Sequence, residues 1–224
     1  MSVEQVEASY VIIGQDILPT PERQSAFREK IGREAVIEQT LVMSAGGTAP
    51  LATEGHKITF PRERITVVSS EARSSFTKDF PGGAADLDEL AHMASVAIHE
   101  AAGSNGAVWP FGFNASIVYS QTTDATATAY LAHRLINRQM FDVAGTHISE
   151  APVISIIGHS VECPQWNLRL EPRFNDLTTS KVFMALNHHF DNADLPISAD
   201  AIAKHLHGVM DHVHQLIEVM DATG

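Results

Sequence analysis

The 224-residue chain contains one cysteine, Cys163, so no disulfide can form within it. It also has no apolar run near the roughly 20 residues that a membrane-spanning helix needs. The first residues, MSVEQ, lack the basic and apolar regions of a secretory signal peptide. We therefore expect a cytoplasmic protein with no membrane partner.

Positive charge is scarce. Lysine and arginine total 15 against 27 acidic residues, which gives a formal net charge of −12. A field of this sign repels phosphate backbones, and nucleic-acid affinity depends on neutralising phosphates with basic side chains. We expect no direct binding to nucleic acid. The acidity has two readings, either plain solubility or an acidic face that docks on a basic partner.

Motifs for nucleotide chemistry and nucleophilic catalysis are missing as well. The glycine pairs Gly46-Gly47 and Gly82-Gly83 match neither a P-loop nor a dinucleotide fingerprint, and no Gly-x-Ser-x-Gly elbow occurs. Cys163 has only His159 nearby in sequence, which does not establish a paired base. We expect no cofactor and assign no catalytic residue, so catalysis is less favoured than binding.

The first half reads as a strand, a helix, further strands and a long helix. Thr20 is expected to cap the first helix, and Gly32 to end it after Ile31. Asp86 and Glu89 have the spacing of a capping box at the start of the long helix. The expected strands lie at 10–14, 36–42, 56–60 and 65–76, and the long helix at 84–102.

The second half repeats this order. Asp124 is expected to cap a short helix that carries Ala127, Leu131 and Leu135 on one side. The expected strands lie at 111–119, 153–159, 166–171 and 181–190, and a last helix at 198–221.

The two halves stay in phase when one is slid over the other. A shift of 104 residues places Phe27 on Leu131, and a shift of 112 places Leu90 on Ile202. We therefore predict an α+β fold made of two β-α-β-β-β-α repeats, residues 1–106 and 107–224, in one pseudo-symmetric domain. Their strands would form a continuous, curved antiparallel sheet with the two long helices packed on one face.

This pattern resembles the TATA-binding-protein-like duplicated fold, although the chain lacks that protein's basic concave face and intercalating aromatics. Two stretches, Asp86–Ser120 and Lys181–Met220, also resemble a sporadically distributed, uncharacterised family of bacterial proteins. The resemblance implies a bacterial protein of related architecture. It implies no activity, because none is established for that family.

Twelve histidines raise the question of metal binding. His207, Asp211 and His214 fall at i, i+4 and i+7 along one stripe of the last helix, where two neighbours could share a metal ion. No further ligand is identifiable in the sequence. A solvated polar helix face explains the same spacing.

Trp109, Phe111 and Phe113 form an aromatic cluster at the start of a central strand. Core packing explains the cluster. If one side of the strand faces an open sheet surface, the same rings could instead line a ligand-binding groove.

The favoured function is a non-enzymatic binding or assembly protein that works through the open sheet face or an edge strand. Its partner would be another protein or a second copy of the chain, giving a homo-oligomer. One alternative is a metal-dependent hydrolase that uses the clustered histidines. The other is an acidic protein that occupies a basic or nucleic-acid-binding partner. The sequence identifies neither the ligand nor the biological process.

Overall fold

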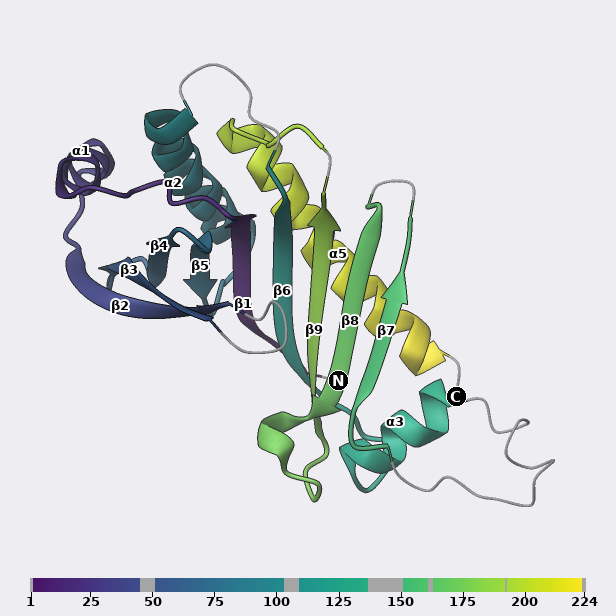
Figure 1. The fold of residues 1–224 in the computed structure, drawn as a ribbon. Helices are drawn as coiled ribbons and strands as arrows, with labels where there is room; N and C mark the ends of the chain where they lie inside the picture. The colour runs from purple at the N-terminus through teal and green to yellow at the C-terminus, as the bar shows by residue number, and fades with distance from the viewer. Residues whose placement is uncertain are drawn as a thin grey trace.

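The computed structural model describes residues 2–44, 51–102, 109–136, 151–160, 163–191 and 193–222. In these residues nine strands form one antiparallel sheet in the order β2-β3-β4-β5-β1-β6-β9-β8-β7. Four α-helices accompany the sheet, so the predicted α+β class is confirmed. Figure 1 shows β1 and β6 side by side in the middle of the sheet.

The first half contributes five strands and two helices. Their bounds are β1 (Ser2–Ile13), α1 (Pro21–Ile31), β2 (Val36–Ser44), β3 (Leu51–Phe60), β4 (Ile65–Ser70), β5 (Arg73–Asp79) and α2 (Ala84–Ala102).

The second half contributes four strands and two helices, plus a short 3-10 turn at Arg173–Asn175. Their bounds are β6 (Phe111–Ser120), α3 (Ala127–Leu135), β7 (Ile154–Gly158), β8 (Gln165–Pro172), β9 (Lys181–Phe190) and α5 (Ala199–Ala222).

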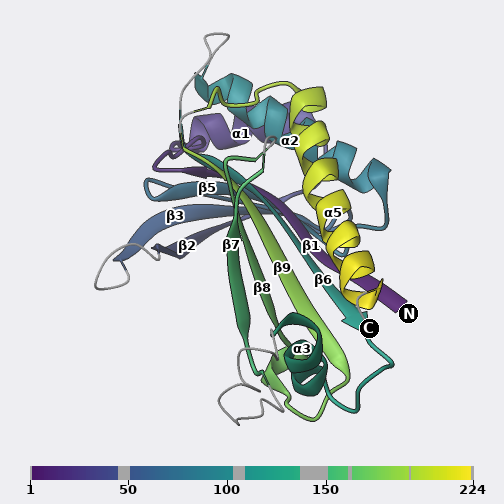
Figure 2. The same ribbon diagram turned by 90° about the vertical axis from the view of Figure 1, so that its right-hand side faces the viewer.

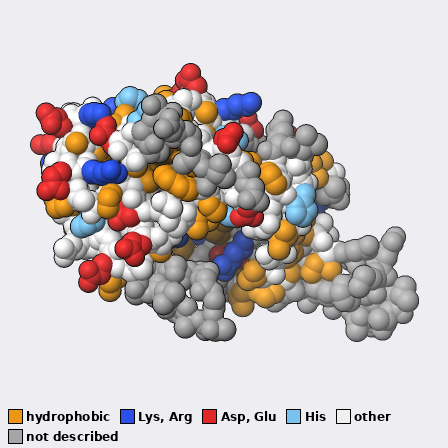
Figure 3. Space-filling model, turned by 45° about the horizontal axis from the view of Figure 1, so that its top comes forward, with side chains coloured by type: hydrophobic (Ala, Val, Ile, Leu, Met, Phe, Trp, Pro, Cys, Tyr) orange, Lys and Arg blue, Asp and Glu red, His pale blue; other side chains and the backbone are white. Residues whose placement is uncertain are grey.

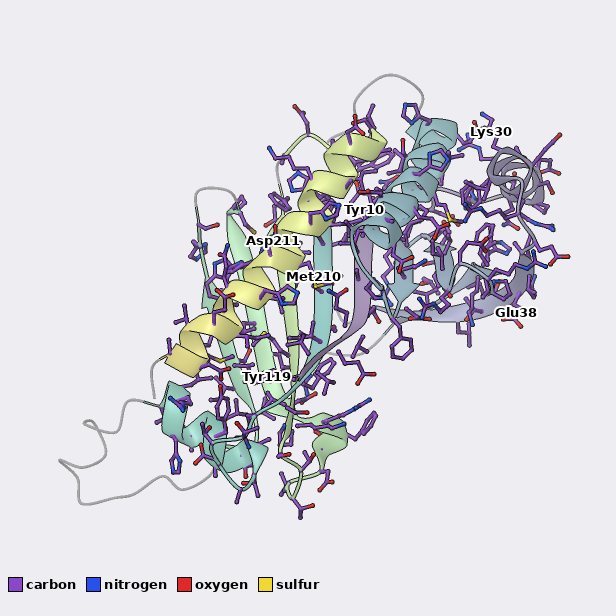
Figure 4. All side chains as sticks on the ribbon, turned by 180° about the vertical axis from the view of Figure 1, so that it is seen from behind. Tyr10, Lys30, Glu38, Tyr119, Met210 and Asp211 are labelled. Atoms are coloured by element: carbon purple, nitrogen blue, oxygen red, sulfur yellow. The ribbon has the colours of Figure 1, made fainter. Side chains whose placement is uncertain are left out.

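All four helices lie on the same face of the sheet. The long helices α2 and α5 pack against each other across its middle, as predicted (Figures 2 and 4). Tyr10 of β1 lies beneath them and is fully buried. Helix α1 inserts Phe27 against Phe60 of β3, and α3 packs Tyr130 against Tyr119 of β6. The opposite sheet face, called here the open face, is the one seen in Figure 1, with α5 passing behind the strands.

Strand alternation divides the side chains between these two faces. In β6, Phe111, Phe113 and Ile117 are each at most 1% exposed on the helix side. Asn114 and Ser116, which alternate with them, are half-buried on the open face. The hydrophobic core therefore occupies the layer between sheet and helices.

A buried lysine joins the sheet to α2. Lys78 of β5 is 2% exposed, and its ammonium group lies 3.0 Å from Asp86 and 2.9 Å from Glu89. Arg33 also binds Glu89. Burial opposes ionisation of Glu89, but hydrogen bonds from Arg33 and Lys78 outweigh it and lower the pKa of its carboxyl group.

One strand prediction was wrong. Residues 65–76 do not form a single strand but the hairpin β4–β5, which turns between Ser70 and Arg73. The Ser70 hydroxyl donates to the Arg73 carbonyl and accepts from its amide, at 3.1 and 3.3 Å. The first half is therefore β-α-β-β-β-β-α in order, with one strand more than predicted.

The helix caps were predicted with mixed success. Thr20 accepts from the Arg23 amide and Gly32 adopts a left-handed φ of 65°, both as expected. Asp86 is not an N-cap, because α2 already begins at Ala84; its carboxylate accepts instead from the Gly82 amide. Asp124 does not cap α3, whose N-cap is Thr126.

Within the described residues, no helix is long and apolar enough to cross a bilayer.

Candidate functional site

One row of polar side chains crosses the open face from strand to strand. The pairing registers place seven of them directly opposite one another, on seven consecutive strands. In sheet order they are Thr59, Thr66, Thr77, Ser9, Asn114, Asn187 and Asn167. None carries a charge, and neighbours lie about 4.8 Å apart, which is the spacing of the strands. We call these seven residues the polar row.

The middle of the polar row is linked by hydrogen bonds. The Asn187 side-chain amide donates to the Asn114 carbonyl oxygen, and the Asn114 amide donates to the Ser9 hydroxyl at 2.9 Å. The carbonyl oxygen of Asn167 is buried and has no hydrogen-bond partner among the described residues. A buried acceptor without a partner costs free energy.

The polar row runs beside a hollow of about 300 Å³, called here the asparagine hollow. Its lining includes Asn114, Asn167 and Asn187 from the row, with Glu7, Ser116 and Arg169 from the next row. Burial raises the pKa of the Glu7 carboxyl group, and the Asp79 carboxylate raises it further. The hollow therefore combines hydrogen-bonding groups with apolar surface from Leu168, Ala185 and Leu186. Its one arginine, Arg169, is already paired to Glu171 at 2.6 Å.

A second hollow, apolar and about 310 Å³ in volume, lies on the same face. It is found where β6, β8 and β9 approach the turn at Arg173–Asn175. Val118 and Phe183 form its floor, and Phe80 and Phe174 lie at its rim. The two rim rings are 49% and 86% exposed. Both residues have positive φ values, 47° and 57°, which are strained for bulky side chains. The backbone thus holds two aromatic rings out toward solvent beside an apolar floor.

The predicted aromatic cluster lies elsewhere. Phe111 and Phe113 point into the helix layer, where Phe113 stacks on Tyr10 at 4.6 Å and on His205 at 4.8 Å. Trp109 is partly buried against the same core. These positions agree with the core-packing alternative and keep Phe111 and Phe113 away from the open face.

The predicted metal ligands do not converge. His207 points toward α2 and pairs with Asp88 at 2.8 Å, whereas Asp211 lies one turn further along α5 with its side chain exposed. His214 is half-buried. Across the described part of the chain, no three His, Cys, Asp or Glu side chains form a group that could hold a metal ion.

Three other histidines do come together, between β9 and α5. His188 and His212 share a hydrogen bond of 2.9 Å, and His205 lies among Phe113 and Phe190. Burial lowers the pKa of all three rings. The pKa of His188 falls to about 4, because His212 and His205 add to the effect of burial. Neutral rings in this layer act as core side chains.

Sequence reasoning missed both the polar row and the apolar hollow. The alternation of apolar and polar residues in 111–119 does indicate which side chains share a face. It does not indicate which residues of distant strands lie opposite one another.

No protein-family model, curated protein or solved structure matches this chain.

Proposed function

We propose that this protein is a non-enzymatic binding protein whose working surface is the open face, and that its ligand is an uncharged peptide segment. The polar row is the observation that carries this proposal. Seven hydrogen-bonding side chains in register on seven strands have no role in packing the helices, which lie on the other face.

The chemistry of the face favours a peptide. Asparagine amides both donate and accept, as peptide groups do, and the row contains three of them, Asn114, Asn187 and Asn167. The apolar hollow beside Phe80 and Phe174 has room for one large apolar side chain. Charged side chains near this floor are paired with one another, Arg169 with Glu171 and Arg173 with Glu4. A charged ligand would have to break such pairs.

The other functions receive less support. The hydrolase hypothesis needs histidines that converge with carboxylates, and His207, Asp211 and His214 do not. The hypothesis of an acidic protein needs acidic side chains gathered on one surface. Figure 3 shows acidic and basic side chains scattered among apolar ones on the face in view.

Peptide display against the purified protein tests the proposal. From a random heptapeptide library we expect enrichment of uncharged sequences with one large apolar residue. Enrichment should fall at least tenfold on the double variant Asn114→Ala, Asn187→Ala and on Phe174→Ala. The control is Asp211→Ala, an exposed change on α5 that should bind as the wild type does. Charged consensus peptides, equal binding by the open-face variants, or no enrichment at all would contradict the proposal.

We also propose that the two halves descend from one duplicated unit. The order of elements supports this, because β1 and β6 are each followed by a short helix, and each half ends in a strand and a long helix. In the sheet, β1 pairs with β5 and β6 pairs with β9, on either side of the β1–β6 contact. Superposition of residues 10–102 on residues 111–220 tests the proposal. The superposition must place β5 on β9 and α2 on α5. If other strands or helices coincide instead, the proposal of a duplication is contradicted.

A further inference from the structure

The edge strand β2 has an unpaired backbone along its outer side. It is the last strand of the sheet, and in the described chain its nine residues pair only with β3. Every second residue of such a strand directs its amide and carbonyl groups outward. These groups are complementary to one kind of partner, another β-strand.

This edge has few of the features that usually block strand addition. Proteins protect exposed edges with prolines, charged side chains or short strands. β2 contains no proline and a single charged residue, Glu38, which lies 3.8 Å from Lys57. Three of its apolar side chains face solvent, Val36 at 51% exposure, Ile37 at 37% and Leu41 at 66%. The opposite edge, β7, is only five residues long.

We propose that β2 pairs antiparallel with β2 of a second copy, about a two-fold axis at Gln39. In this register Ile37 lies opposite Leu41 of the partner subunit, so the two exposed apolar side chains on the helix side cover each other. Gln39 lies opposite its own copy, and the two amides can hydrogen-bond. Glu38 lies opposite Thr40 of the partner subunit, so the two acidic groups do not face each other.

Neighbouring registers are worse by the same criteria. A centre at Glu38 sets the two Glu38 carboxylates directly opposite, and like charges in that position are destabilising. A centre at Thr40 places Leu41 opposite Gln39 of the partner subunit. The apolar contact between Ile37 and Leu41 is then lost. Of these three registers, only the one centred at Gln39 both pairs Ile37 with Leu41 and keeps the two Glu38 carboxylates from facing each other. This is why we choose a second copy over an unrelated strand.

Salt should strengthen this dimer. Each copy carries a formal charge of −12, so two copies repel each other at long range, whereas the strand itself contributes one charge per copy. Screening weakens the repulsion and leaves the apolar and backbone contacts in place. The interface is one strand wide, so we expect a dissociation constant of about 10–100 µM.

Cysteine crosslinking tests the register. In the variant Gln39→Cys the two introduced residues lie directly opposite, with Cα atoms about 4.5–5.5 Å apart, which a disulfide can span. Mild oxidation at about 100 µM protein should give mostly covalent dimer. The control is Val36→Cys, another exposed position on β2. In the proposed register position 36 lies opposite position 42 of the second copy. The two introduced cysteines would therefore be six residues apart along the strands, about 20 Å, and should not crosslink. Wild type, whose Cys163 is buried, should stay uncrosslinked.

Sedimentation equilibrium gives a second measurement without cysteine chemistry. Leu41→Lys should weaken the dimer at least tenfold, and Leu177→Lys, a change at a 52% exposed leucine elsewhere, should not. Circular dichroism checks that each variant is folded. The proposal is overturned if folded Gln39→Cys fails to crosslink, if Val36→Cys crosslinks equally well, or if wild type is monomeric at 500 µM in 0.5 M salt. Each of these outcomes leaves the open-face proposal intact, because peptide display probes a different surface.

Discussion

Neighbouring residues of β6 lie in two different environments, because alternate side chains point to opposite faces of the sheet. Phe113 is fully buried between Tyr10 and His205, whereas Asn114 faces the asparagine hollow and bonds to its neighbours in the polar row. The helix-covered face carries the aromatic and aliphatic core. The open face carries the hydroxyl and amide groups of the polar row and, beside them, the apolar hollow. We therefore expect substitutions on the helix-covered face to lower stability, and substitutions on the open face to weaken the proposed peptide binding.

The largest effect is expected on the helix side at Phe113. Phe113→Ala removes a ring that stacks on Tyr10 and His205, and should lower the free energy of unfolding by about 4 kcal/mol. Urea unfolding followed by circular dichroism measures the change. A loss below about 1 kcal/mol would mean that this face does not carry the core.

The next largest effect is expected at Lys78, also on the helix side. Lys78→Ala leaves Asp86 and Glu89 without their buried cation and should cost about 3 kcal/mol. The matched control is Lys57→Ala, because Lys57 is 41% exposed and pairs loosely with Glu38. Its effect should stay within about 0.5 kcal/mol. Equal losses in the two variants would contradict the ion-pair account.

A smaller and pH-dependent effect is expected at His188. Its pKa is about 4 in the folded chain and 6.5 unfolded, so the unfolded state binds more protons between these values. The contribution of the neutral His188 ring to the free energy of unfolding is therefore fully present above pH 6.5. It is lost as the pH falls toward 4. We expect roughly 1–2 kcal/mol after allowing for the ring's contact with solvent.

The variant His188→Leu isolates this contribution. Its stability loss between pH 7.5 and pH 5 should be smaller than that of wild type, because His205 and His212 remain to titrate but His188 does not. Urea midpoints at the two pH values make the comparison. An unchanged pH dependence would assign the acid sensitivity to other groups.

The smallest effect on stability is expected on the open face. Asn187→Ala removes one half-buried hydrogen bond to Asn114 and should change the free energy of unfolding by less than about 1 kcal/mol. The same change should weaken the capture of peptides selected on wild type. A loss of stability comparable to that of Phe113→Ala would erase the division between the faces.

Much of the fold could be predicted from local sequence, because period and caps are local properties. Thr20 and Gly32 bound the first helix as expected, and the strand 181–190 was predicted to the residue. The start of β1 was missed, since Glu4 and Glu7 interrupt its apolar pattern. The β4–β5 turn was missed because Ser70 and Arg73 close it with side-chain hydrogen bonds and no glycine or proline marks it.

The candidate site could not be predicted in the same way. Ser9 and Asn114 are 105 positions apart, and Asn114 and Asn187 are 73 apart. Their alignment follows from the registers of two long-range strand pairs, which no local pattern specifies. The rim of the apolar hollow depends on left-handed backbone at Phe80 and Phe174, a conformation that phenylalanine rarely adopts. The outward direction of the two rings was therefore unexpected.

The contact between β1 and β6 has a consequence for synthesis on the ribosome. β1 is made first and can pair with β5 on one side once residue 79 has emerged, but its other side waits for residues 111–120. Until then the nascent chain exposes a long strand edge whose partner does not yet exist. Such edges recruit other chains, and pairing over more than a hundred residues is slow. A pause in translation before residue 111 should therefore promote aggregation, and a chaperone that shields β1 during this interval should raise the yield of native protein.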